Sequence, residues 1–160
     1  MLTVTLMRGK YQNIDAPENV LHYLSCDHDR ESDRRKCLQF FSPNMVGDPD
    51  FMAYSMKLTQ QMYKNCGTGW KRIHHLVITL PDKKSMSRSP AFNLAILSAR
   101  FFSCQGFQTA CGVFMNYDTS LYEIHLGISS ISAYTGKTLQ FNEEYLNYLQ
   151  ELFSWYFSAC

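Results

Sequence analysis

Residues 116–137 read NYDTSLYEIHLGISSISAYTGK, and this stretch decides how the rest of the chain is interpreted. Alternate side chains of a strand point to the same face, so a strand here presents Glu123 and His125 together and turns Ile124 and Leu126 toward a core. A carboxylate and an imidazole side by side can ligate a divalent cation. They also fit the solvated polar face of a hairpin, and the spacing leaves both interpretations open.

The sequence predicts a β-hairpin around this stretch. Residues 109–117 and 122–132 have the composition of strands, and the turn residues 118–120 join them, which implies antiparallel pairing. The pairing is expected to bring Asn116 close to Glu123. With His125, three oxygen or nitrogen donors then converge, a set that suits Mg²⁺ or Mn²⁺ better than structural zinc.

The remaining elements predict an α+β fold. We expect an edge strand over residues 1–7, a polar loop over 26–37 and a central strand over 73–80. Helices are expected to begin at Ala16, at Pro49 with Asp48 as N-cap, at Ser89, and after an Asn142 cap; Phe51, Ser55, Leu58 and Met62 are spaced for the apolar face of the second. The expected architecture is an antiparallel sheet flanked by helices, in two or three layers, as a single domain over residues 1–160.

Composition narrows the classes of protein to which the chain can belong. The 15 basic and 14 acidic residues balance, so the chain lacks the overall positive charge of many nucleic-acid binders, although local patches suffice for binding. The six cysteines form no Cys-x-x-Cys pair, which predicts reduced thiols. The start of the chain lacks the pattern of a signal peptide, and no apolar stretch is long enough to span a bilayer. These features predict a cytoplasmic protein.

Several other residues have two possible roles. Tyr23 in the first helix is a potential nucleophile or a packing residue. His74 and His75 are adjacent in a strand, so only one can face a given site, and either can be a core or edge histidine. The basic residues of three loop segments either contact phosphates or are ordinary surface: Arg34, Arg35 and Lys36, then Lys71 and Arg72, then Lys83, Lys84 and Arg88.

The order of these motifs resembles the relaxases, the mobilisation nucleases of plasmids and other conjugative elements, which belong to the HUH endonucleases. The similar segments are ENVLHYLSCDHD (residues 18–29), HHLVITLPDKK (74–84), SPAFNLAILSARFFS (89–103) and the hairpin with its Thr-Gly-Lys turn. Three positions differ from the family pattern: Asn116 and Glu123 stand where the family carries histidines, and Ser129 stands where it usually carries an asparagine. His125 and the Asp118-Thr119 pair are retained.

The resemblance implies a function and a set of roles. A relaxase nicks single-stranded DNA at an origin-of-transfer hairpin by metal-assisted transesterification, leaving a 5′-phosphotyrosyl link and a free 3′-hydroxyl. It implies Tyr23 as the nucleophile and Asp118 as a residue that orients a metal ligand. By the same comparison Glu123, His125 and Asn116 hold Mg²⁺ or Mn²⁺, and Arg34, Arg35, Lys36, Lys83, Lys84 and Lys137 bind DNA.

Two alternatives remain beside active nicking. One is a relaxase-derived protein that binds DNA or regulates a mobile element without cleaving, which the two replaced histidines motivate. The other is an unrelated α+β interaction module. Accessory mobilisation proteins are further expected partners of a plasmid relaxase.

Overall fold

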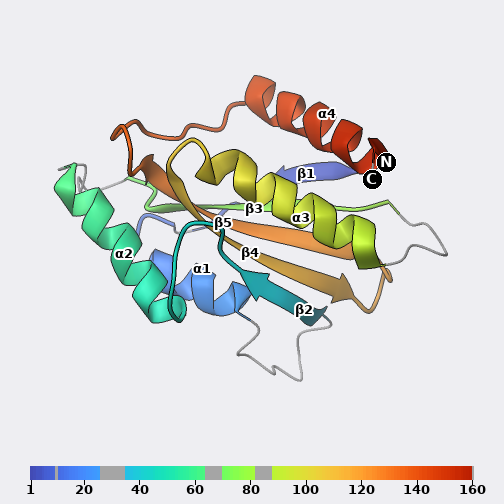
Figure 1. The fold of residues 1–160 in the computed structure, drawn as a ribbon, viewed down its shortest axis with the longest axis horizontal. Helices are drawn as coiled ribbons and strands as arrows, with labels where there is room; N and C mark the ends of the chain where they lie inside the picture. The colour runs from blue at the N-terminus through green and yellow to red at the C-terminus, as the bar shows by residue number, and fades with distance from the viewer. Residues whose placement is uncertain (10, 26–34, 64–69, 82–87, 160) are drawn as a thin grey trace.

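The computed structural model describes residues 1–9, 11–25, 35–63, 70–81 and 88–159. The elements follow in the order β1 (Thr3–Leu6), α1 (Ala16–Leu24), β2 (Arg35–Phe41), α2 (Pro49–Met62), β3 (Ile73–Thr79), α3 (Arg88–Ser103), β4 (Phe107–Asn116), β5 (Tyr122–Ser132) and α4 (Glu143–Ala159) (Figure 1).

The five strands form one sheet in the order β1-β3-β5-β4-β2, and every neighbouring pair is antiparallel. This confirms the predicted α+β fold, and β1 lies at the edge as expected. The middle strand, β5, is buried along its whole length. A strand buried on both faces needs cover on each side, and helices provide it.

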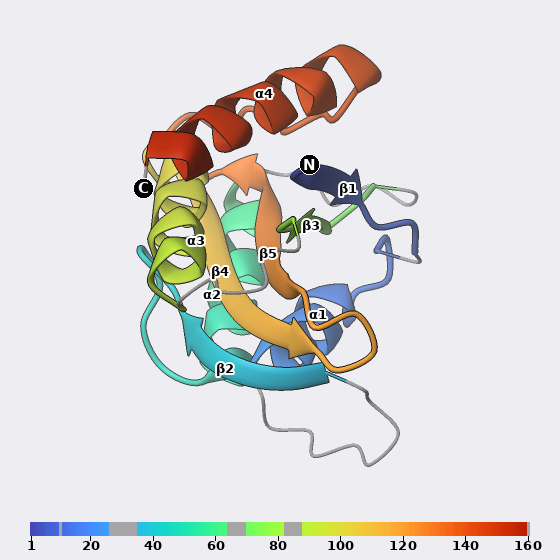
Figure 2. The ribbon, with the colours of Figure 1, turned by 90° about the vertical axis from the view of Figure 1, so that its right-hand side faces the viewer.

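Helices cover the two faces of the sheet, giving three layers (Figures 1 and 2). On one face α3 and α4 pack over Leu126 and Ile128 of β5, with Phe102 and Phe153 among the largest buried side chains. On the other face α1 and α2 pack over a smaller core that includes Ala110 and Phe114 of β4. The predicted alternation of β5 is confirmed, because Ile124, Leu126 and Ile128 all belong to the α3–α4 core.

Two helix starts follow the predicted capping chemistry. The Asp48 carboxylate accepts a hydrogen bond from the Phe51 amide (2.8 Å), with Pro49 in the first turn of α2. The Asn142 side chain accepts one from the Tyr145 amide (2.8 Å) at the start of α4, where Glu143 and Glu144 favour the helix dipole.

Two predictions about elements are wrong. Arg35, Lys36 and Cys37 do not belong to a loop, because they begin strand β2, which pairs with β4. The predicted apolar face of α2 is also wrong: Phe51, Leu58 and Met62 are exposed. The buried face instead carries Met52, Ala53, Met56, Thr59 and Gln60, and the Gln60 amide donates to the carbonyl of Arg72 (2.6 Å).

The prediction of reduced thiols is wrong for Cys37, which is disulfide-bonded, whereas Cys104 and Cys111 are free. In the described part of the chain, none of the helices has the length and apolar character to cross a membrane.

Candidate active site on the α1 face of the sheet

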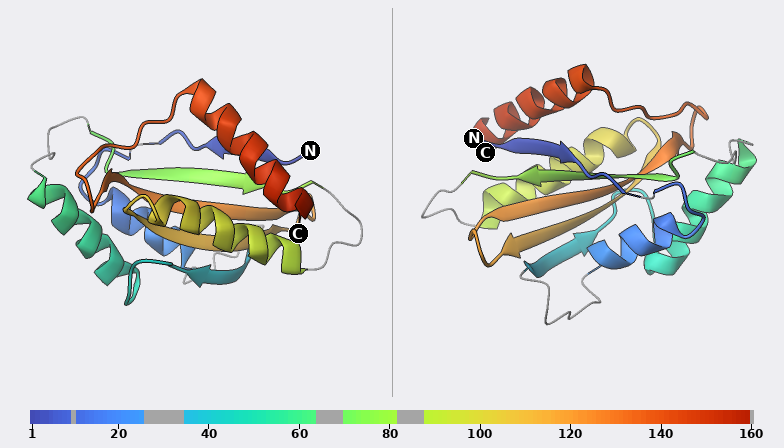
Figure 3. Two further views of the ribbon diagram at one scale, coloured as in Figure 1. Left: turned by 45° about the horizontal axis from the view of Figure 1, so that its top comes forward. Right: turned by 180° about the vertical axis from the view of Figure 1, so that it is seen from behind.

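Helix α1 places Tyr23 over the middle of the sheet. Val20, Leu21 and Leu24 are buried against the strands, and α1 lies across this face (Figure 3, right). The Tyr23 ring, in the last turn, stacks on Phe114 with 5.7 Å between ring centroids. It lies 5.6 Å from each of the His75 and His125 rings. Tyr23 therefore faces the hairpin residues.

The close approach of α1 depends on Gly112 of β4. A Cβ at this position would lie 2.8 Å from the Leu24 carbonyl oxygen and 2.7 Å from the Phe114 ring. Both distances are too short for real contacts, so a side chain here would push the end of α1 outward. Because Tyr23 is the residue before Leu24, Gly112 contributes to where Tyr23 lies.

The hairpin brings its predicted polar residues together. Asn116 donates from Nδ2 to Glu123 Oε1 (3.0 Å), and His125 Nε2 lies 3.1 Å from Glu123 Oε2. Asn116 Oδ1 accepts the backbone amides of Asp118 (3.0 Å) and Thr119 (3.4 Å), which closes the turn. Asp118 is exposed on this turn, and its amide thereby fixes the Asn116 side chain.

Arg35 joins the two halves of the site. Its Nε donates to Glu123 Oε2 (2.8 Å) and its Nη1 donates to the Tyr23 hydroxyl (2.8 Å). Arg35 pairs with Asn116 across β2 and β4, so the guanidinium projects from a strand. The charged sequence around Arg35 predicted a loop and a DNA-binding role, whereas the structure places the residue at the start of β2.

His75, for which the sequence allowed either a site or a core role, also lies in this cluster. Its Nε2 lies 3.0 Å from His125 Nδ1, and its Nδ1 lies 3.3 Å from the Tyr11 hydroxyl. A carboxylate only accepts, so His125 Nε2 must donate to Glu123. With both imidazoles neutral, the chain then runs in one direction, from the Tyr11 hydroxyl through His75 and His125 to Glu123.

The electrostatics of the site follow from burial and pairing. Burial alone would raise the pKa of the Glu123 carboxyl, but hydrogen bonds from His125 and Asn116 and the charge of Arg35 outweigh it, so this pKa lies below its usual value. Burial, helped by His125 and Arg35, lowers the pKa of His75 to about 3. At neutral pH the site therefore holds a charged Glu123, a charged Arg35 and a neutral His75.

The arrangement of the predicted metal ligands does not fit a divalent cation. Both Glu123 oxygens accept hydrogen bonds, and His125 Nε2 carries a hydrogen toward Glu123, which leaves that nitrogen no lone pair for a metal. Arg35 already places a positive charge on the carboxylate. Across the described residues, no three His, Cys, Asp or Glu side chains are grouped as a metal site.

A cavity of about 400 Å³ opens beside Tyr23. Its walls include Tyr11, Asn19, Tyr23, Arg35 and His75. The Arg35 side chain is one-third exposed. The phenol and the guanidinium therefore border a space that a ligand can enter from solvent.

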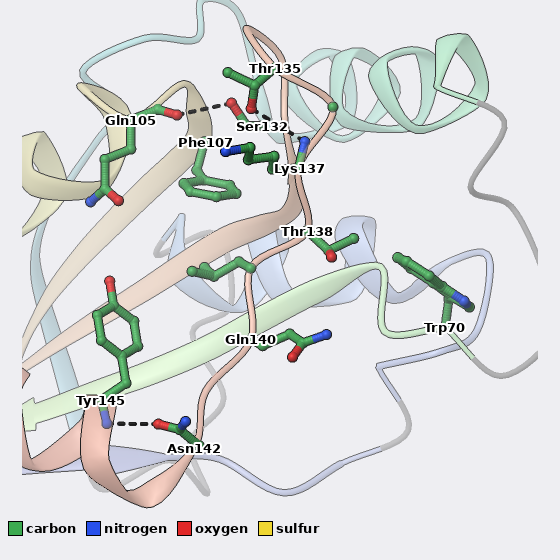
Figure 4. Close-up of a pocket in the computed structure, with 12 residues that line it drawn as sticks. Trp70, Gln105, Phe107, Ser132, Thr135, Lys137, Thr138, Gln140, Asn142 and Tyr145 are labelled. Atoms are coloured by element: carbon green, nitrogen blue, oxygen red, sulfur yellow. Dashed lines mark hydrogen bonds between the residues drawn. The ribbon is translucent and has the colours of Figure 1, made fainter.

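The other predicted DNA-binding residues do not gather here. Lys36 is exposed on β2, and Arg34, Lys83 and Lys84 lie outside the described residues. Lys137 is exposed beyond the far end of β5, where its carbonyl accepts the Ser132 amide (2.9 Å). At about 3.3 Å per residue, roughly 30 Å of strand separates Ser132 from Glu123. Lys137 instead borders a second pocket of about 830 Å³ with Thr135, Gln105 and Tyr145 (Figure 4).

His74 belongs to the opposite face. Its Nε2 donates to the Leu139 carbonyl (3.1 Å) and its ring packs on Phe141, with 5.0 Å between centroids. The two neighbouring histidines are thus divided as strand geometry predicts, with His75 at the candidate site and His74 beneath the segment that leads to α4.

Comparison with known families identifies the family of the chain. The model of the relaxase family, described as the MobA/VirD2-like nuclease domain, matches residues 23–154. The chain belongs to this relaxase family. The match begins at Tyr23 and includes the whole hairpin. Relaxases bind single-stranded DNA at an origin of transfer and generally use a divalent metal. No curated protein matches the chain.

Proposed function

We propose that this relaxase nicks single-stranded DNA by transferring a DNA phosphate to Tyr23. The observation that carries the proposal is the position of the Tyr23 hydroxyl, 2.8 Å from the Arg35 guanidinium and at the edge of an open cavity. A nucleophile beside a fixed cation suits phosphoryl transfer, because negative charge builds on the phosphate oxygens in the transition state.

The step balances as a transesterification. A bond forms between the Tyr23 oxygen and the phosphorus, and the bond from phosphorus to the 3′ oxygen breaks. The phenolic proton passes overall to that 3′ oxygen by way of solvent. The products are a 5′-phosphotyrosyl link and a free 3′-hydroxyl, and the reverse step rejoins the strand.

The neighbouring residues have separate tasks in this proposal. Arg35 donates to a phosphate oxygen and keeps the phenol oriented. Glu123 holds Arg35 in place, and Asn116 and His125 hold Glu123. Phe114 stacks on the Tyr23 ring and restricts its rotation.

The biological setting belongs to the same proposal. The DNA is an origin-of-transfer hairpin of a plasmid or related element, the work takes place in the cytoplasm, and accessory mobilisation proteins take part. Single-stranded DNA is the partner that the family membership supports most directly.

A covalent-adduct gel tests nicking. The protein is incubated with oligonucleotides that carry a random central segment, so that the pool includes many target sequences, and is then run under denaturing conditions. We expect a shifted band whose DNA can be sequenced. Tyr23→Phe should abolish the band, whereas Tyr148→Phe, on the opposite side of the molecule, should keep it. An adduct on Tyr23→Phe would contradict the role of Tyr23.

A second candidate function is DNA binding without nicking. Asn116 and Glu123 at two histidine positions, with their polar atoms paired to each other, favour it. Retention of the same oligonucleotides on a filter, with no covalent adduct under any condition, would support this candidate against the first.

A further inference from the structure

The Arg35 guanidinium occupies the middle of the polar cluster. Two of its nitrogens bond to different partners, Nε to Glu123 and Nη1 to Tyr23, each at 2.8 Å. Asn116 and His125 bond to the same carboxylate from other directions. Arg35 therefore lies between the predicted metal ligands and the nucleophile, where a catalytic cation would be needed.

We infer that Arg35 replaces the divalent ion in this relaxase, so that the site binds a DNA phosphate through the guanidinium and works without Mg²⁺ or Mn²⁺. The claim that Arg35 binds a DNA phosphate rests on the proposed function. The claim that the site takes no divalent ion does not, because it follows from the contacts of Glu123 and His125.

The chemistry of arginine agrees with the replacement of a divalent ion by Arg35. A guanidinium stays charged at all physiological pH values and presents five donors in a planar fork, so that one arginine can hold a carboxylate and a phosphate oxygen together. Glu123 brings one negative charge, and the positive charge of Arg35 lies directly against it. Asn116, as a neutral amide, donates its Nδ2 hydrogen to Glu123 and so completes the carboxylate's hydrogen bonds without adding charge.

The position of Arg35 is fixed by the sheet. Arg35 pairs with Asn116 and Lys36 with Met115 in the β2–β4 ladder, so the backbone beneath the guanidinium is hydrogen-bonded. The side chain is still one-third exposed and borders the cavity of about 400 Å³. The cation is thus held by Glu123 and lies at the wall of a cavity that a phosphate can enter.

Manganese binding tests the inference without any DNA. The electron paramagnetic resonance signal of free Mn²⁺ is measured while protein is added. We expect wild type to leave this signal unchanged. Arg35→Gln should reduce the signal, because Glu123 then lacks the positive charge beside it. The affinity of this variant for Mn²⁺ should be at least about tenfold above that of wild type. The double variant Arg35→Gln/Glu123→Gln should lose that uptake. Arg100→Gln, an exposed arginine of α3, should behave as wild type.

Two results of the titration with wild type or Arg35→Gln would overturn the inference. One is uptake of Mn²⁺ by wild type that Glu123→Gln abolishes, a measurement that needs no Arg35 variant. The other is a folded Arg35→Gln, checked by circular dichroism, that takes up no more Mn²⁺ than wild type. Arg35→Lys keeps the charge and should leave the Mn²⁺ signal unchanged, so uptake by this variant would also count against the inference.

The adduct gel with and without EDTA separates this inference from the proposed function. An adduct that persists in EDTA and is lost in Arg35→Gln supports both. An adduct that requires Mn²⁺ overturns the inference and leaves nicking intact. Absence of any adduct counts against nicking, while the Mn²⁺ titration still decides whether Arg35 has taken the place of the metal.

Discussion

Glu123 is the residue on which the charge balance of the site depends. It is buried, yet three partners hold it in the charged form, namely Asn116, His125 and Arg35. Burial of a carboxylate is unfavourable unless hydrogen bonds and an opposite charge compensate for it. Glu123 and Arg35 therefore stabilise one another, and a change in either leaves the other without its counterpart.

Replacement of Glu123 by glutamine should reveal this dependence. The variant keeps the shape of the side chain but removes the charge that balances Arg35. We expect the free energy of unfolding, measured by urea denaturation, to fall by about 2 kcal/mol, below the usual cost for a fully buried pair because Arg35 is one-third exposed. Glu144→Gln, an exposed change in α4, should have almost no effect. Equal stability of the two variants would refute the pairing argument.

The sequence predicted the meeting of the hairpin residues, named Arg35 only as a DNA-binding residue of a loop, and left the role of His75 open. Asn116, Glu123 and His125 lie in one hairpin, where the period of two and a short turn predict the contacts. Tyr23 came from the family resemblance. Arg35 and His75 lie on strands that pair with segments far away in the sequence. No local sequence pattern predicts such pairing.

At the scale of elements, the packing of α1 on the sheet determines the position of the proposed nucleophile, Tyr23. Gly112 and Gly127 both face α1 from the sheet, but their surroundings differ. A Cβ at Gly112 meets the backbone oxygen of Leu24 at 2.8 Å, whereas one at Gly127 meets a methyl carbon of Leu24 at 3.0 Å. Side chains can move aside more easily than a helix backbone, so the two sites form a matched pair.

Alanine at these two positions should therefore have unequal effects. Gly112→Ala is expected to lower the free energy of unfolding by about 2 kcal/mol, as overpacking in a core does, and to reduce the yield of the Tyr23 adduct. Gly127→Ala should cost about 1 kcal/mol or less, because flexible side chains give way. Urea denaturation and the adduct gel measure the two quantities. A larger loss in Gly127→Ala would show that α1 is held in another way.

Two element-scale predictions failed for physical reasons. Strand β2 follows a highly charged segment, lies at the sheet edge and contains a bulge between Cys37 and Gln39, so it lacks the regular alternation that predicts a strand. Helix α2 has apolar residues on both sides. Its buried side was decided by partners that the sequence does not show, including the Arg72 carbonyl that Gln60 binds.

At the scale of the whole molecule, the sheet separates the candidate site from a second buried histidine. His75 faces α1, while His74 faces the segment before α4, where its Nδ1 is buried and meets no hydrogen-bond partner among the residues that the structure describes. Burial and the nearby charge of Lys71 lower the pKa of His74 to about 4, although its bond to Leu139 acts the other way. Both histidines are therefore neutral in the folded protein at neutral pH.

This neutrality predicts how stability depends on pH. In the unfolded chain His74 binds a proton below about pH 6.5, whereas in the folded protein it does so only near pH 4. Between these values the unfolded state holds more protons, so stability falls as pH falls, by up to about 1.4 kcal/mol per pH unit for each such histidine. His75 acts in the same direction. Urea denaturation at about pH 7 and about pH 5, above the range where most carboxylates titrate, should show the loss. The glutamine of His74→Gln can still donate to the Leu139 carbonyl but does not titrate. The loss of stability between the two pH values should therefore be smaller in this variant than in wild type. An unchanged loss would mean that His74 contributes nothing to the pH dependence.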